Sequence, residues 1–174
     1  MITTEQTEKV RGWFAGRLPE EWQSGPADVT VDRDEITVML QVPDVDLPGG
    51  TAAAEVAEAR AGRAKAFRED TRERRMAIAR EAESRYERKV SWGVGVGAEH
   101  GELFTHLAAP VMTRLRQPQR QVLDTLVDAG VARSRSDALA WCVRLVGQHE
   151  SDWLADLRAA MGQVAEVRTK GPTA

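Results

Sequence analysis

Alternation of apolar and polar residues predicts three β-strands in the first part of the chain. The clearest runs are residues 36–42 and 90–97, and a shorter run covers residues 28–31. The polar residues 32–35 predict a hairpin turn between the first two strands. The apolar positions on one face are Ile36, Val38, Leu40 and Val42 in one long run and Val90, Trp92, Val94 and Val96 in the other. Three glycines occupy the opposite face of the last strand, which predicts a helix packed closely over that face.

Helical periodicity predicts two helices in the same region. Thr3 and Gln6 have the spacing of a capping box and predict a helix over residues 4–15. Residues 52–88 carry a narrow apolar stripe at steps of three and four, which predicts one long helix with most of its surface exposed. We expect residues 103–107 to form a hairpin partner for the third strand. Together these elements predict a small antiparallel sheet with a helix on one face.

A second unit follows Ala108, Ala109 and Pro110. Residues 111–116 alternate between apolar and polar positions and predict a short strand, and Pro118 begins a helix that ends at Gly130. A lone strand cannot satisfy its own backbone groups, so this strand requires a partner strand. If the same strand of a second copy supplies that partner, the result is a two-fold antiparallel ribbon and a homodimer.

The rest of the second unit is predicted to be helical. Ser134 and Asp137 have capping spacing before a second helix, and apolar positions at helical steps continue beyond Gly147 toward residue 168. The pattern allows a third helix after a break near Gly147 or one long helix that bends there. The predicted fold class is therefore α+β, with residues 1–107 as an α+β module of unknown role and residues 108–170 as a dimerising unit of one strand and two or three helices.

Charge is distributed unevenly along the 174 residues. The net charge is −3, but residues 1–59 carry −8 and residues 60–90 carry +5. No run approaches the roughly 20 apolar residues of a membrane span, and no secretory signal is visible at the start. The single cysteine, Cys142, excludes an intramolecular disulfide and lies on an apolar helical stripe, so we expect it to pack in a core. These features predict a protein of the reducing cytoplasm that does not enter membranes.

The second unit resembles the ribbon-helix-helix family of DNA-binding proteins. The resemblance lies in residues 111–116, 122–127 and 130–139, and the run from Ser134 to Ala138 (Ser-Arg-Ser-Asp-Ala) is its most specific part. It implies a dimer whose two-stranded ribbon enters the major groove of duplex DNA. It also implies base-reading side chains on the outer face of the strand, namely Met112, Arg114 and Arg116. The start of the second helix would hold a DNA phosphate through Arg133, Ser134, Arg135 and Ser136.

Other chemistry is not indicated. The sequence has no nucleophile–base pair, no phosphate-binding loop and no metal-ligand spacing, so we expect no enzyme activity, no cofactor and no metal. The favoured hypothesis is a sequence-specific DNA-binding transcription regulator whose first module senses a small molecule or binds a protein. An alternative is a non-enzymatic interaction or scaffold protein in which the strand-helix-helix unit only dimerises. A further alternative is RNA binding through the basic residues 60–90.

Overall fold

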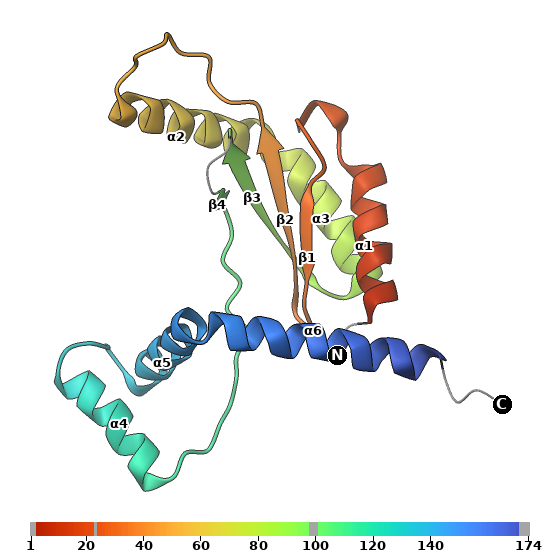
Figure 1. The fold of residues 1–174 in the computed structure, drawn as a ribbon. Helices are drawn as coiled ribbons and strands as arrows, with labels where there is room; N and C mark the ends of the chain where they lie inside the picture. The colour runs from red at the N-terminus through yellow and green to blue at the C-terminus, as the bar shows by residue number, and fades with distance from the viewer. Residues whose placement is uncertain (1–2, 23, 98–100, 171–174) are drawn as a thin grey trace. The chain divides into compact units, whose positions relative to one another are not determined.

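The chain folds into two compact units of mixed α and β structure (Figure 1). The structure is a computed structural model that describes residues 3–22, 24–97 and 101–170. Unit 1 is Met1–Pro110 and unit 2 is Val111–Ala174. The predicted α+β class is confirmed.

The sheet of unit 1 has four strands in the order β1-β2-β3-β4. The strands are β1 (Asp28–Val31), β2 (Glu35–Val42), β3 (Lys89–Val96) and β4 (Glu102–Leu103). Strands β1 and β2 form the predicted antiparallel hairpin, and the carboxylate of Asp32 accepts hydrogen bonds from the backbone N–H groups of Asp34 and Glu35 at 2.8 and 2.7 Å. Strands β2 and β3 are parallel, so the prediction of an antiparallel sheet was wrong. The helices between β2 and β3 carry the chain back to the end of the sheet at which β2 begins. Strand β3 therefore runs in the same direction as β2, and the pair is parallel.

Three α-helices and a short 3-10 helix complete the part of unit 1 that the structure describes. They are α1 (Thr4–Arg17), η1 (Glu20–Trp22), α2 (Ala53–Asp70) and α3 (Arg72–Tyr86). Helix α1 begins with the predicted capping box between Thr3 and Gln6. The single long helix predicted over residues 52–88 is two helices that meet at Thr71. The hydroxyl of Thr71 donates to the carbonyl of Phe67 at 2.6 Å, a side-chain hydrogen bond that competes with regular helix geometry.

The core of unit 1 lies between one face of the sheet and the helices. The alternating residues of β2 from Ile36 to Val42 are buried there, as are Phe14 of α1 and Ile78 of α3. Edge-to-face aromatic contacts join Phe14 and Trp22 to Trp92 of β3. The period-2 pattern of the sequence therefore marks the buried face correctly.

The glycines of β3 lie on the other face of the sheet. A Cβ built on Gly93 would meet the Met39 side chain, and one built on Gly95 would lie 2.6 Å from the amide group of Gln41. Both covering residues belong to β2, which is the parallel neighbour of β3. The prediction of a helix over these glycines was wrong, because side chains of the adjacent strand cover them.

The described part of unit 2 contains three helices. They are α4 (Gln117–Asp128), α5 (Arg135–His149) and α6 (Ser151–Lys170). Gly147 lies inside α5, and the helix break comes at Glu150, whose backbone leaves the helical region with φ −117° and ψ 30°. A small core of Leu123, Ala132 and Ala138 joins α4 to α5, and the half-buried Cys142 packs against it.

Residues 111–116 do not form the predicted strand in the single chain. No neighbouring segment within the described parts of unit 2 pairs with their backbone, and a strand requires such a partner. If Met112, Arg114 and Arg116 formed the outer face of a strand, Val111, Thr113 and Leu115 would point inward. In the structure Leu115 packs against the α4–α5 core, whereas Val111 and Thr113 are exposed.

Candidate functional site

The segment before α4 places two arginines and two apolar side chains in solvent. Val111 is 87% exposed and Met112 is 97% exposed. Arg114 and Arg116 are exposed as well, and neither guanidinium makes an ion pair with a residue that the structure describes. The backbone N–H of Arg116 donates to Oε1 of Gln119 at 2.9 Å, which fixes the start of α4. The predicted base-reading residues are therefore accessible beside an ordered helix.

The start of α5 carries the predicted phosphate-binding residues close together. The hydroxyl of Ser134 accepts a hydrogen bond from the backbone N–H of Asp137 at 3.2 Å and caps the helix. The carboxylate of Asp137 in turn accepts from the backbone N–H of Arg133 at 3.1 Å and lies 3.4 Å from the Nε of Arg133. The backbone hydrogen bond first, and then the guanidinium, lowers the pKa of the Asp137 carboxyl. Ser136 is exposed in the first turn of the helix.

Arg135 is held by α4 rather than left free. Its Nε and Nη2 atoms donate to the two carboxylate oxygens of Asp124 at 2.6 and 2.8 Å. These hydrogen bonds lower the pKa of the Asp124 carboxyl and raise the pKa of Arg135. A phosphate at the start of α5 would therefore compete with Asp124 for this guanidinium.

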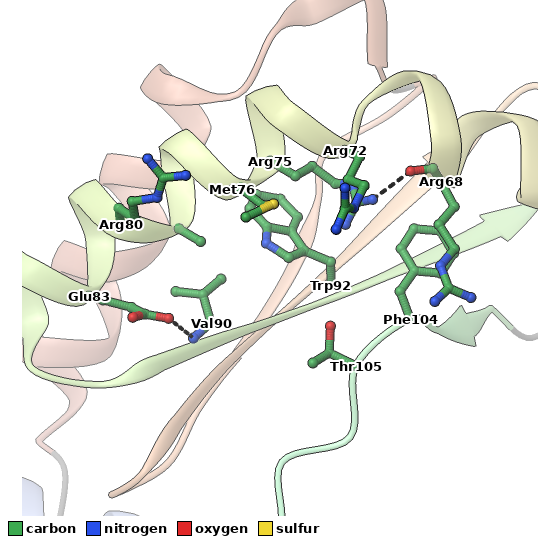
Figure 2. Close-up of a pocket in the computed structure, with 11 residues that line it drawn as sticks. Arg68, Arg72, Arg75, Met76, Arg80, Glu83, Val90, Trp92, Phe104 and Thr105 are labelled. Carbon is green, nitrogen blue, oxygen red and sulfur yellow. Dashed lines mark hydrogen bonds between the residues drawn. The ribbon is translucent and has the colours of Figure 1, made fainter.

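Unit 1 contains a second candidate site, a pocket of about 350 Å³ rich in arginine (Figure 2). Arg68 comes from the end of α2, and Arg72, Arg75 and Arg80 come from α3. Apolar side chains also line the pocket: Met76 and Ala79 come from α3, Val90 and Trp92 from β3, and Phe104 follows β4. Glu83 is the one acidic residue among the pocket-lining residues that the structure describes, and it pairs with Lys89 at 2.9 Å.

Arg75 is buried in this pocket, and no carboxylate of the described residues pairs with it. Its Nε donates to the hydroxyl of Thr71 at 2.9 Å, and its Nη2 donates to the carbonyl of Arg68 at 2.7 Å. The guanidinium lies 4.9 Å from the centre of the Phe104 ring. Burial, and then the positive charges of Arg68 and Arg72, lower the pKa of Arg75. The pocket therefore has an excess of positive charge that an anion would neutralise.

Trp92, which lines the same pocket, carries a buried donor. The indole N–H of Trp92 is buried and has no acceptor among the residues that the structure describes. A buried donor without an acceptor is costly, so a ligand oxygen near this N–H would be favoured. Guanidinium donors beside apolar side chains fit a small molecule that carries a phosphate or carboxylate group.

Sequence reasoning missed this pocket. The spacing of Arg68, Arg72 and Arg75 by four and three residues puts them on one helix face, which is a usable signal. The pattern by itself is typical of a solvated charged helix. What makes it a pocket is the approach of Phe104, which lies far away in the sequence.

Two other kinds of site are not found in the described parts of the chain. No group of three or more His, Cys, Asp or Glu side chains there is arranged to hold a metal ion. No helix there combines the length and apolar character required to cross a membrane.

The fold and these sites define a two-unit α+β protein with an arginine-lined pocket in one unit and a small helical second unit. The chain belongs to the family of Rv1265-like proteins. The model of the Rv1265-like protein N-terminal domain matches residues 8–102, and the model of the Mb1296 C-terminal domain matches residues 116–168.

Relatives at high identity come from mycobacteria. The chain is 61% identical over 160 residues to protein Mb1296 of Mycobacterium bovis and to protein Rv1265 of Mycobacterium tuberculosis, both named as uncharacterized. The match covers 92% of this chain and 69% of each relative. No solved structure matches the chain.

Proposed function

We propose that this protein binds duplex DNA as a homodimer and regulates transcription in the cytoplasm. In this proposal, residues 111–116 of two copies pair as an antiparallel ribbon in the major groove. Met112, Arg114 and Arg116 then face the bases, and the first turn of α5 lies against the DNA backbone.

The observation that carries the proposal is the state of residues 111–116. Their backbone has no strand partner among the described residues, and the apolar side chains of Val111 and Met112 are almost fully exposed. Exposed apolar residues beside unpaired backbone are typical of a segment that pairs with another chain. The N-terminus of α5, which Ser134 caps, is the positive end of the helix dipole, and Arg133 and Arg135 beside it add positive charge for a phosphate.

The test uses duplexes that the wild-type chain selects from a random DNA pool. Arg114→Ala should weaken binding to the selected duplex by about 1–3 kcal/mol for each base that the arginine reads. The same substitution should weaken binding to random DNA much less. Arg158→Ala, which removes one exposed charge from α6, is the matched control. Equal losses on both duplexes would show that Arg114 does not read bases.

The scaffold alternative makes the opposite prediction at low salt. Phosphate contacts are strongest there, so a DNA-binding protein binds mixed genomic DNA more tightly at low salt than at moderate salt. If a fluorescence titration detects no binding even at low salt, the second unit only dimerises. Tighter binding to RNA than to duplex DNA would favour the RNA alternative.

A second function is favoured by the pocket in unit 1, in which Arg75 is buried and pairs with no carboxylate of residues 3–22, 24–97 and 101–170. We propose that this pocket binds a small anion with a phosphate or carboxylate group, which acts as the effector of the protein. The guanidinium groups would hold the anionic group, and Trp92 and Phe104 would contact the apolar part.

Thermal unfolding tests this second function with two simple probes, inorganic phosphate and acetate, compared with chloride at equal ionic strength. A probe at ten times its dissociation constant stabilises the folded state by about 1.4 kcal/mol. Arg72→Met, an exposed change at the rim, should reduce this stabilisation, whereas Arg33→Met in the turn between β1 and β2 should not. Equal stabilisation in both variants would mean that the anion binds elsewhere, and no stabilisation of the wild type would remove the proposal.

A further inference from the structure

Helix α6 has an apolar face with no cover in the described structure. None of its described side chains is buried, and Leu154 alone is half-buried. Trp153 is 56% exposed, Leu157 41%, Met161 44% and Val164 56%. An apolar stripe of this size on a helix of 20 residues is a binding surface.

The spacing of the stripe is that of a coiled coil. Leu154, Leu157, Met161 and Val164 follow one another at steps of three, four and three, which places them at alternating a and d positions of a heptad. A seam of this kind is matched by another helix with the same repeat. A second copy of α6 has that repeat by definition.

Charge at the two ends of the seam selects the direction of the pairing. Four residues after Val164 the seam position is Arg168, in the last turn of α6. Asp152 lies in the first turn of α6 and Lys170 in its last turn. A parallel pair would place like charges opposite each other at both ends, whereas an antiparallel pair places acidic residues opposite basic ones.

We infer that α6 pairs with α6 of a second copy as an antiparallel coiled coil. This contact is separate from the pairing of residues 111–116 and does not depend on DNA binding. It gives the chain a second self-association surface in unit 2.

The first test compares two double variants that add the same two charges to α6. Leu157→Glu with Met161→Glu places them in the seam, and Ala155→Glu with Ala159→Glu places them on the opposite face at the same spacing. Sedimentation equilibrium should show self-association at least tenfold weaker in the seam variant than in the control. Circular dichroism verifies that both variants keep their helices. Equal association in the two variants would overturn the inference.

A variant that cannot form the ribbon separates the α6 contact from the pairing of residues 111–116. Met112→Pro with Thr113→Pro removes backbone donors from residues 111–116, so it breaks a ribbon and leaves α6 intact. Self-association should persist in this background and disappear when the seam variant is added. If the proline background is already monomeric, the ribbon alone joins the copies and the α6 pairing is wrong.

The direction of the pairing has its own measurement. A nitroxide label on Lys170→Cys, with Cys142→Ala to leave one thiol, reports the distance between the two α6 ends. With Leu157 opposite Met161, an antiparallel pair separates the labelled residues by about 33 Å along the axis, from 22 residues at 1.5 Å each. A distance below about 20 Å would indicate a parallel pair and overturn the antiparallel arrangement.

Discussion

The close approach of β4 to Gly93 gives a sharp prediction about stability. A Cβ on Gly93 would contact the side chain of Met39 and would lie 2.8 Å from the carbonyl oxygen of Glu102. The thioether of Met39 can rotate away, but the Glu102 carbonyl is backbone of β4, which pairs with β3 through Gly93 and Leu103. At Gly95 the nearest atoms all belong to the flexible end of the Gln41 side chain. The two glycines should therefore respond differently to the same methyl group.

Gly93→Ala should cost about 1–3 kcal/mol, the usual cost of overpacking. For a unit of this size that cost lowers the melting temperature by roughly 5–15 °C. Gly95→Ala should stay within about 1 kcal/mol of the wild type, because the loss of chain entropy in the unfolded state offsets a small rotation of Gln41. Thermal unfolding is followed by tryptophan fluorescence, with Trp141 and Trp153 replaced by Phe so that the signal reports unit 1.

Equal stability of the two alanine variants would refute the packing argument, since β4 would then not be fixed over Gly93. Met39→Ala offers a further check in the Gly93→Ala background. It should recover only part of the lost stability, because the Glu102 oxygen stays in place. Full recovery would show that the side chain of Met39 causes the whole effect.

Two further predictions concern the carboxylates of unit 2. Asp124→Asn should release Arg135 for a DNA phosphate, which raises DNA affinity about two- to fivefold and steepens its salt dependence. The control is Asp128→Asn, which removes the same charge from α4 without freeing an arginine. A DNA titration in which the two variants behave alike would contradict this prediction. The pKa values of Asp124 and Asp137 are lowered from 3.8, so both carboxylates stabilise unit 2 above about pH 4, and this stabilisation is lost as the pH falls through their lower folded-state values. Far-ultraviolet circular dichroism between pH 5 and pH 2 should show acid unfolding that is less steep in Asp124→Asn, and an unchanged profile would show that the Arg135 ion pair adds no stability.

Local patterns in the sequence were sufficient to predict the elements that local physics determines. The alternating run at 36–42 differs from β2 by one residue at its start, and the run at 90–97 differs from β3 by one residue at each end. The capping spacing of Thr3 and Gln6 predicts the start of α1, and both reciprocal hydrogen bonds are present. For the capping box, the deciding hydrogen bonds lie within three residues of each other.

The pairing of strands could not be predicted in the same way, because it depends on long-range contacts. A signal was nevertheless available. The segment at 52–88 was predicted to be helical and lies between two strands, and a helical connection of that length is what a parallel pair requires. The pairing of residues 111–116 raises the same difficulty between chains, so the sequence supports it only through the family resemblance.

The pocket in unit 1 and the packing at Gly93 are parts of one arrangement. The backbone N–H of Phe104, which follows β4, donates to the carbonyl of Trp92 at 2.7 Å, and the Phe104 ring lies under the Arg75 guanidinium. A methyl group at position 93 that pushes β4 away would also move Phe104 and open the pocket to water, which weakens its hold on an anion. Gly93→Ala should therefore reduce the stabilisation by inorganic phosphate, whereas Gly95→Ala should keep the full stabilisation. The measurement is the shift in melting temperature that phosphate causes in each variant, relative to the same variant without phosphate. If phosphate stabilises Gly93→Ala as much as it stabilises the wild type, the position of Phe104 does not determine anion binding.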